Sequence, residues 1–303
     1  MAMVLLRVLD DRFQADLWCQ ALAVEGIPQL LRTYQDTAYD GLFVSQKGYA
    51  SLYVEEADLA RAREMDQGLM GRVLADLADP AALAKALDHT LLDPAAGQAE
   101  LEIHLRECLE MGAAAACVSP WMAPLAAREL AGGPVALCVV VGFPLGTHTA
   151  GAKLREALEL AELGAQELDV VINRGLVASG RAGQAVEEVA AIAQALPGCQ
   201  IKVILESAAL GPELNQDLAR RFTGSGVAFL KTGSGYFGAA TVADVQMLKA
   251  AAPGLKVKAA GGIRDLDQAL ALLGAGAERL GTSSGYAIWL EARRRWWGAP
   301  HGA

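Results

Sequence analysis

The larger part of the chain, from about residue 77 onward, repeats one pattern. Short runs rich in β-branched and apolar residues alternate with longer stretches rich in Ala, Leu and Glu, which is typical of β-α units around a parallel sheet. Eight such runs follow one another, centred near His89, Cys117, Cys138, Val170, Val203, Leu230, Lys258 and Leu280. Their mean spacing of about 27 residues accommodates a strand, a helix and two loops. The sequence therefore predicts the α/β class and favours a closed (β/α)8 barrel over a doubly wound open sheet.

The first 68 or so residues follow a different pattern. Four apolar segments predict strands, at residues 4–9, 27–31, 41–44 and 49–54. Amphipathic stretches predict helices at 13–24 and 55–70, so the order is β-α-β-β-α with a hairpin near 45–48. Pro28 places its strand at an edge, because proline cannot donate to a sheet ladder. We expect a small α+β domain here.

The chain is thus expected to have four parts: a small α+β accessory domain at 1–70, a linker at 71–80, the barrel at 81–298 and a tail at 299–303. Nothing in the first part concentrates titratable side chains. A docking or dimerisation role suits it better than a second catalytic unit.

Composition excludes several classes of protein. Acidic residues outnumber basic ones 35 to 26, and the net charge of −9 argues against a partner that is nucleic acid or an anionic membrane. The five cysteines include no CxxC pair and the four histidines no HExxH, so no metal site is expected. The apolar run at the N-terminus is too short for a secretory signal, which predicts a cytoplasmic protein with reduced thiols.

Charged residues interrupt the apolar runs of the predicted barrel. Parallel strands are buried on both faces, so an ionisable side chain within one is costly and needs a reason. Three acids and three lysines stand at such positions: Asp88, Asp169, Glu206, Lys202, Lys231 and Lys258. If their strand faces point into the barrel, the six side chains meet and compensate one another in charge.

Two of these lysines suggest a specific chemistry. Lys231 and Lys258 end neighbouring strands, beside glycine-rich or small-residue turns, where this architecture builds active sites. A lysine amine attacks a carbonyl only when neutral, and its ordinary pKa of about 10.4 keeps it protonated at pH 7. A nearby ammonium and a poorly solvated pocket both favour the neutral form and so prepare an amine for Schiff-base formation. With Asp169 placed to shuttle protons through water, the set indicates an iminium-forming aldolase.

Two glycine patterns superficially indicate other enzymes. Residues 233–238 spell GxGxxG, but the acidic residue that a dinucleotide-binding fold places about 20 residues later is absent. Residues 281–285 spell GxSxG, the nucleophile elbow of serine hydrolases. The acid and histidine that follow Ser283, Glu291 and His301, lie too near it in sequence to form a triad from separate strand ends. We therefore predict neither dinucleotide binding nor serine-hydrolase catalysis from these patterns.

The same glycines and serines suit a phosphate site. Loops after the seventh and eighth strands of such a barrel commonly hold phosphate, together with the N-terminus of a short helix. Gly261 and Gly262 supply one loop, and Ser283 and Ser284 open the other. The alternative is that the glycines only permit tight turns.

Eight motifs span the barrel from end to end. In chain order they are DHTLL at 88–92, ACVSP at 116–120, VVGFPLG at 140–146, ELDVVIN at 167–173, KVILE at 202–206, FLKTGSGY at 229–236, VKAAGGIR at 257–264 and GTSSG at 281–285. From about residue 83 to 289 the chain resembles the deoxyribose-phosphate aldolase family. The resemblance implies a (β/α)8 barrel, usually dimeric, that uses no metal or cofactor. It also implies reversible cleavage of 2-deoxy-D-ribose 5-phosphate to D-glyceraldehyde 3-phosphate and acetaldehyde.

The resemblance also implies residue roles. Lys231 would be the Schiff-base lysine, Lys258 the neighbour that favours its neutral form, and Asp169 the proton-relay carboxylate. The substrate pocket would be lined by three further residues, of which the first two orient the relay: Asp88, Lys202 and Cys117. The phosphate would be held by Gly235, Gly261, Gly262, Ser283 and Ser284.

The chain departs from the family pattern in two places. The usual lysine loop reads KTSTGF, whereas Gly233, Ser234 and Tyr236 stand here. Some members extend a C-terminal tyrosine into the site, but the tail WWGAPHGA contains none. The first departure affects the rigidity of the loop and its phosphate contacts.

Other hypotheses remain open from the sequence. One is a different phosphosugar aldolase of the same iminium type, and another is a sensor that binds a sugar phosphate without chemistry and uses the N-terminal domain as its output. A serine hydrolase is the third and the least favoured. The expected partners are a phosphosugar, an aldehyde and a second copy of the chain in a homodimer.

Overall fold

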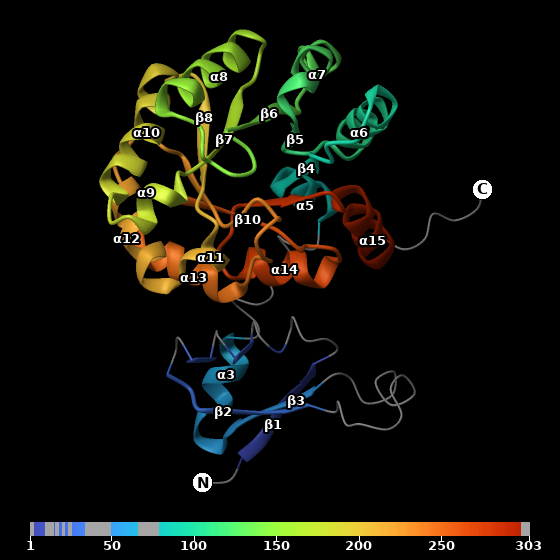
Figure 1. Cartoon of the computed structure of the whole chain (residues 1–303). Coiled ribbons are helices and arrows are strands. Elements are labelled where there is room, and N and C mark those ends of the chain that lie inside the picture. The colour runs from blue at the N-terminus through green and yellow to red at the C-terminus, as the bar shows by residue number, and fades with distance from the viewer. Residues whose placement is uncertain are drawn as a thin grey trace, which may run out of the picture. The chain divides into compact units, whose positions relative to one another are not determined.

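The structure is a computed structural model that forms two compact units, Met1–Asp79 and Pro80–Ala303 (Figure 1). It describes residues 3–9, 15, 18–19, 22–23, 26–33, 50–65 and 79–297. The predicted strand at 41–44, the hairpin at 45–48, most of the linker and the tail at 299–303 lie outside these ranges.

The N-terminal unit contains a three-stranded antiparallel sheet in the order β1-β3-β2. Its elements are β1 at Met3–Leu9, β2 at Gln29–Thr33, β3 at Ala50–Glu55, a 3-10 helix at Glu56–Asp58 and α3 at Leu59–Met65. β2 lies at an edge of the sheet, as Pro28 predicted. Ala15, Trp18 and Leu22 are helical and buried against the sheet, within the predicted helix at 13–24. The small α+β fold of this region is confirmed.

The second unit is a closed barrel of eight parallel strands, as predicted. They are β4 at Leu87–Leu91, β5 at Ala115–Val118, β6 at Ala136–Val141, β7 at Glu167–Val171, β8 at Gln200–Ile204, β9 at Phe229–Lys231, β10 at Lys256–Ala260 and β11 at Arg279–Thr282. Each predicted strand centre falls within one of them. The ring runs from β4 to β11 in sequence order and closes where β11 pairs with β4.

Helices surround the strands (Figure 1). They are α5 at Pro80–Ala86, α6 at Gln98–Met111, α7 at Ala123–Leu130, α8 at Ala150–Glu162, α9 at Arg174–Ala178, α10 at Ala182–Ala195, α11 at Ser207–Leu210, α12 at Pro212–Phe222, α13 at Val242–Ala251, α14 at Leu266–Gly274 and α15 at Gly285–Trp297. A 3-10 turn at Pro120–Met122 precedes α7. Among the described residues, no helix is long and apolar enough to cross a membrane.

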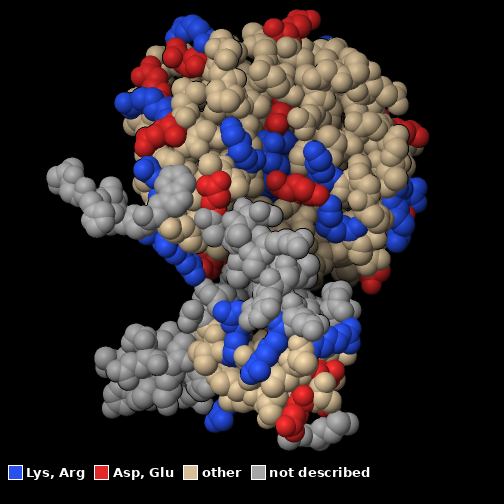
Figure 2. All heavy atoms as spheres, turned by 180° about the vertical axis from the view of Figure 1, so that it is seen from behind, with Lys and Arg blue, Asp and Glu red and all other residues tan. Residues whose placement is uncertain are grey.

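Strand alternation separates an apolar layer from a polar one. In β7 every residue is buried, so both faces are covered. Leu168 and Val170 alternate with Glu167 and Asp169, which places the aliphatic pair toward the helices and the acidic pair inside the barrel. The outer layer therefore supplies most of the hydrophobic packing, and the interior holds the charged groups beside a small apolar cluster that includes Cys138 and Val140. On the face drawn in Figure 2, acidic and basic side chains of the barrel are interspersed.

A histidine pair lies between β4 and α6. The rings of His89 and His104 are 4.4 Å apart, and His89 Nε2 is 2.9 Å from Glu107 Oε2. His104 is 4% exposed. Burial, with the neighbouring His89, lowers the pKa of His104 from 6.5 to about 3. His104 is therefore neutral in the folded protein at any ordinary pH.

This depressed pKa predicts an acid-sensitive stability. The contribution of His104 to folding stability is fully present above its unfolded pKa of 6.5 and is lost as the pH falls toward about 3. In this range the unfolded chain binds a proton that the folded chain does not bind. Between these values His104 should remove about 1.4 kcal/mol of unfolding free energy per pH unit. Urea unfolding at pH 7 and pH 4.5 measures the loss, which should shrink in His104→Gln and persist in the control His148→Gln, at an exposed position. Equal losses in all three proteins would contradict the assignment.

Candidate active site

A network of ion pairs fills the centre of the barrel. Three carboxylates contact four cationic side chains, contributed by β4, β7, β8, β9, β10 and β11: Asp88, Glu167, Asp169, Lys202, Lys231, Lys258 and Arg279. Residues that face each other across paired strands point the same way, and the register pairs Lys231 with Lys258 and Lys258 with Arg279. The pairing of the strands thus brings the basic side chains together.

Asp169 is the hub of this network. Its Oδ2 accepts hydrogen bonds from the Nζ atoms of both Lys231 and Lys258, each at 2.7 Å. Its Oδ1 accepts from Lys202 Nζ at 2.9 Å and from Cys138 Sγ at 3.2 Å. One carboxylate therefore holds three ammonium groups that would otherwise repel one another.

The other two carboxylates, of Asp88 and Glu167, bind the cationic groups that lie farthest from the cavity. Lys258 Nζ is 2.5 Å from Asp88 Oδ2, and Lys202 Nζ is 2.6 Å from Glu167 Oε2. Arg279 bridges both acids, with Nε 2.5 Å from Asp88 Oδ1 and Nη2 3.0 Å from Glu167 Oε2. These pairs satisfy charges that have almost no access to water.

The pKa values of the buried members favour their charged forms. Burial works against ionisation of Asp169, but Lys202, Lys231 and Lys258 outweigh it and hold its pKa well below the usual range. Burial likewise opposes the charged forms of Lys202 and Lys258, yet the carboxylates around them raise both pKa values. Asp88 also has a lowered pKa, because Lys258 and Lys202 overcome its burial. Lys202 and Lys258 are therefore permanent cations.

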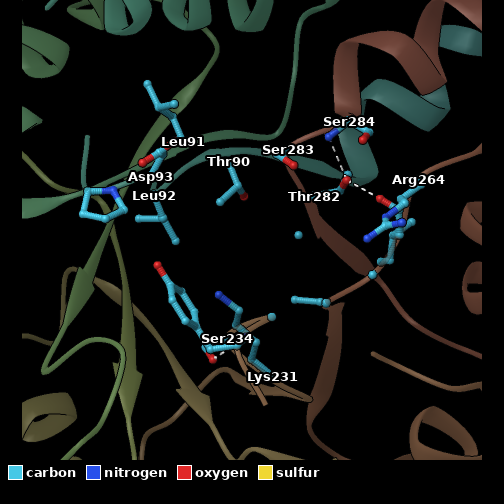
Figure 3. A pocket seen from close by; sticks show the side chains of 18 residues that line it. Thr90, Leu91, Leu92, Asp93, Lys231, Ser234, Arg264, Thr282, Ser283 and Ser284 are labelled. Atoms are coloured by element: carbon cyan, nitrogen blue, oxygen red, sulfur yellow. Dashed lines mark hydrogen bonds between the residues drawn. The ribbon is translucent and has the colours of Figure 1, made fainter. Parts of the chain in front are cut away.

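Lys231 differs from the other two lysines in its position. Lys202 and Lys258 are 0% exposed, whereas Lys231 reaches a cavity of about 830 Å³ at the C-terminal ends of the strands. In Figure 3 its amine points into this cavity, with Thr90 and Leu92 across from it. Lys231 is therefore the lysine of the network that a ligand in the cavity can reach.

A second part of the cavity wall offers backbone donors. Gly235, Gly261, Gly262, Ser283 and Ser284, the predicted phosphate residues, all line the cavity. The N–H groups of Gly235, Gly262 and Ser283 have no protein acceptor among the residues that the structure describes. α15 begins at Gly285, so the positive end of its dipole lies beside Ser283 and Ser284. Arg264 stands near these serines in Figure 3. This wall suits an anion.

Gly261 cannot be replaced without displacing that wall. Its φ of 109° lies in the region that side chains disfavour, and a Cβ on it would lie 2.6 Å from the carbonyl oxygen of Gly238. The two loops therefore pack backbone against backbone. The close approach explains the glycine pair at 261 and 262.

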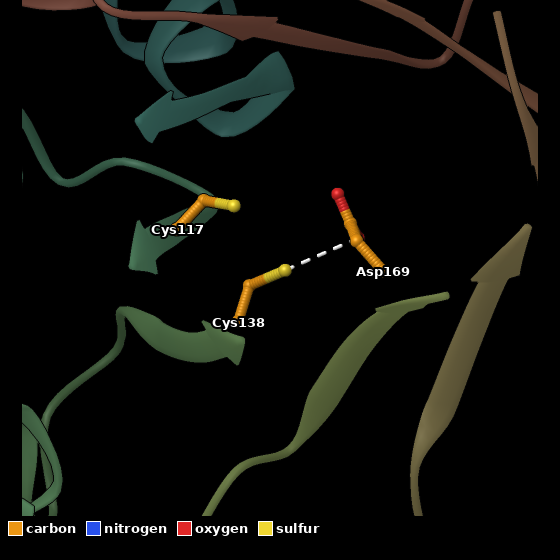
Figure 4. Close-up of side chains that lie close together, drawn as sticks. All are labelled: Cys117, Cys138 and Asp169. Carbon is orange, nitrogen blue, oxygen red and sulfur yellow. Dashed lines mark hydrogen bonds between the residues drawn. The ribbon is translucent and has the colours of Figure 1, made fainter. Parts of the chain in front are cut away.

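Two buried thiols adjoin Asp169 (Figure 4). Cys117 and Cys138 face each other across β5 and β6, and interaction with Cys138 lowers the pKa of Cys117 to about 7. With Asp169 they form a trio of atoms close enough to hold a metal ion, and Cys138 forms another with Asp88 and Glu167. Both trios fit a metal poorly, because their carboxylates already bind lysine or arginine. We derive no metal chemistry from them.

The predicted pocket residues divide into two groups. Lys231 and the five predicted phosphate residues line the cavity. Asp88, Cys117 and Lys202 are 0% exposed and belong to the packed interior below it, as do Asp169 and Lys258. The structure thus places the first group at the C-terminal end of the barrel and the second group in its centre, out of reach of the cavity.

Glu206 corrects the predicted charge cluster. The sequence placed it with Lys202 on one strand face, but β8 ends at Ile204 and the backbone turns at Glu206, where φ is 62°. Its carboxylate accepts a hydrogen bond from the Ser234 N–H at 3.0 Å and takes no part in the network. The assumption that the strand continued to Glu206 was wrong.

Three residues of the site were missed. Glu167 stands two positions before Asp169 in the same strand, and this period of two could have revealed it. Arg279 opens the short strand β11, a position at which a charge is usually exposed. Arg264 follows Gly261 and Gly262 in the loop after β10. The glycine at position 281 leaves room for a neighbouring side chain, because a Cβ on Gly281 would lie only 2.9 Å from Lys258 Cε.

Comparison with known proteins identifies the family. Residues 82–291, more than half of the chain, match the sequence model described as DeoC/LacD family aldolase. The chain belongs to this aldolase family. Relatives named deoxyribose-phosphate aldolase in Thermosynechococcus vestitus and Microcystis aeruginosa are 45% and 42% identical to it over 202 and 204 residues. These alignments cover 66% and 67% of this chain, and 93% and 90% of the relatives.

Two solved structures of aldolases have the same barrel. An aldolase designated QR15 is 37% identical, with a TM-score of 0.68 over 70% of this chain and 96% of its own. A tetrameric deoxyribose phosphate aldolase from Aeropyrum pernix is 32% identical, with a TM-score of 0.67 over 74% of this chain and 97% of its own. The family likeness covers the barrel, and the N-terminal unit lies outside the matched residues 82–291.

The ion-pair network predicts a large cost for Glu167→Ala. The change leaves Lys202 and Arg279 with one carboxylate fewer in a site that already holds more cations than acids, and breaking a buried pair typically costs about 3–5 kcal/mol. Urea unfolding measures this loss. The control Glu162→Ala, at an exposed position of α8, should change stability by less than about 0.5 kcal/mol. A matching small effect of Glu167→Ala would show that the network does not depend on this acid.

Proposed function

We propose that this family member is a deoxyribose-phosphate aldolase of class I. It cleaves 2-deoxy-D-ribose 5-phosphate reversibly to D-glyceraldehyde 3-phosphate and acetaldehyde through a Schiff base. The observation that carries the proposal is the Lys231 amine at the cavity, sharing Asp169 Oδ2 with Lys258. Relatives named for this activity are 42% to 45% identical and match the barrel along most of their length.

Lys231 is the nucleophile in this proposal. Lys202 and Lys258 stay protonated inside the network, so they cannot attack a carbonyl. Loss of one proton from Lys231 leaves three cations facing three carboxylates. The neutral amine adds to C1 of the open-chain sugar, and loss of water from the adduct gives an iminium ion. The positive nitrogen then occupies the place of the original ammonium beside Asp169.

The iminium ion draws electrons from the bond to be broken. The C3 hydroxyl gives up its proton, the C2–C3 bond cleaves, and its electron pair forms an enamine with the iminium carbon. D-glyceraldehyde 3-phosphate leaves at this point. Protonation of the enamine at C2 and hydrolysis of the new iminium ion release acetaldehyde and restore the Lys231 amine.

Asp169 and Lys258 act on this sequence from below the cavity. A carboxylate with so low a pKa is a weak base, so Asp169 hands the proton on through water and does not retain it. Its second task is to hold Lys231 and Lys258 side by side. The permanent charge of Lys258 favours the neutral form of its neighbour. Asp88 and Lys202 orient this pair, and Cys117 packs beneath it.

The phosphate of the sugar binds at the opposite wall. The free N–H groups of Gly235, Gly262 and Ser283 and the α15 N-terminus supply donors, and Ser284 adds a hydroxyl. Arg264 offers a charge that the sequence prediction did not include. A local site of this kind binds a dianion in a protein whose net charge is −9. The homodimer and the cytoplasmic location stay predictions.

Lys231→Arg tests the covalent step. The guanidinium keeps the positive charge but stays protonated, so it cannot condense with an aldehyde. Borohydride in the presence of acetaldehyde should trap an adduct of 28 mass units, about the mass of an ethyl group less one hydrogen, on the wild type and on the exposed control Lys85→Arg. Lys231→Arg should show no adduct and no cleavage of 2-deoxyribose 5-phosphate. An adduct that persists in Lys231→Arg would place the Schiff base elsewhere.

Removal of residues 1–76 tests whether catalysis needs the N-terminal unit. Because the chain forms two compact units and every described residue that lines the cavity belongs to the second, we expect the fragment from residue 77 to keep kcat and KM within about twofold of the full chain. Steady-state cleavage assays measure both constants, and gel filtration reports any change of assembly. A soluble, folded fragment without activity would assign the N-terminal unit a part in catalysis.

A further inference from the structure

Glu206 combines burial, an unusual backbone and an unpaired charge. Its side chain is 2% exposed, and its φ of 62° is the one positive value of a non-glycine residue among those the structure describes. In the described part of the chain no lysine, arginine or histidine forms an ion pair with it. A strained backbone and a buried lone carboxylate both cost stability, and such costs concentrate at functional sites.

The carboxylate fastens the loop that follows Lys231. Glu206 Oε1 accepts the Ser234 N–H at 3.0 Å. The backbone holds the chain on both sides of Glu206, since the Leu205 N–H donates to the Lys231 carbonyl at 2.9 Å and the Ser207 N–H donates to the Thr232 carbonyl at 2.7 Å. The turn at residue 206 thus aims its side chain across the loop.

The loop that follows Lys231 packs closely against Glu206. The hollow between Glu206, Ser207, Thr232 and Gly233 has a volume of only about 10 Å³. The Ser234 hydroxyl in turn accepts the Tyr236 N–H at 3.2 Å. Two of the amides of the loop are therefore bound within the protein. The Gly235 N–H between them has no acceptor among the described residues and belongs to the cavity wall.

We propose that Glu206 is a positioning residue that fixes the loop at residues 232–236 so that the Gly235 N–H is directed at the phosphoryl group of the substrate. This inference rests on the proposed function. Glu206 acts through its acceptor oxygen and touches no substrate atom. Its negative charge works against an anionic ligand, so the hydrogen bond and not the charge is the useful property.

Three substitutions separate the acceptor from the charge. Glu206→Gln keeps an oxygen at the same reach and removes the charge. Glu206→Asp keeps the charge but shortens the side chain by one methylene, and Glu206→Ala removes both. Glu213→Ala, at an exposed position of the neighbouring helix α12, is the matched control.

The readout compares a substrate with a phosphate and one without. Loss of a hydrogen bond to a charged group should raise KM for 2-deoxyribose 5-phosphate about tenfold or more in Glu206→Ala and Glu206→Asp. For unphosphorylated 2-deoxyribose, kcat/KM should stay within twofold of the wild type, and borohydride trapping of acetaldehyde on Lys231 should be unchanged. Glu206→Gln and Glu213→Ala should resemble the wild type with both substrates.

Each other outcome overturns the inference. Equal losses with both sugars in Glu206→Asp would mean that Glu206 supports the fold or the chemistry in general. A Glu206→Gln variant that behaves like Glu206→Asp would assign the effect to the charge. If Glu206→Ala fails to fold, Glu206→Asp and Glu206→Gln still decide. A wild type that forms no acetaldehyde adduct would instead refute the proposed function.

Discussion

The ion pairs at Asp169 determine what the rest of the barrel can do. A single carboxylate binds three ammonium groups, two of them at the same oxygen. Without it, Lys202, Lys231 and Lys258 would repel one another in a space with almost no water. The acid both stabilises the cluster and holds Lys231, the proposed nucleophile, beside the cationic Lys258. Stability and reactivity therefore depend on one side chain.

The closed barrel brings together charged residues that lie far apart in the sequence. Register pairs residues of neighbouring strands, so basic groups far apart in the chain become adjacent as soon as the ring closes. The aliphatic residues between them face the helices and supply the hydrophobic stabilisation. The interior is thus free for polar groups that serve chemistry.

Most of the barrel and much of the site could be predicted from the sequence. The eight apolar runs fix the strands, and a lysine in an apolar run is rare enough to be informative. Glu206 could not be placed, because a positive φ in a glutamate leaves no local signal. Arg279 could not be assigned either, because a charge at a strand end is usually exposed and its partners Asp88 and Glu167 lie on other strands. These two residues depend on tertiary structure.

The division between a packed ionic interior and a wall built from loops has a consequence for evolution and engineering. Each member of the interior contacts partners on other strands, so single changes there demand compensation at a second position. The loops after β9, β10 and β11 line the cavity mainly with glycine and serine residues, together with Tyr236 and Arg264. New sugar acceptors should therefore emerge by remodelling of these three loops, while the interior is inherited unchanged.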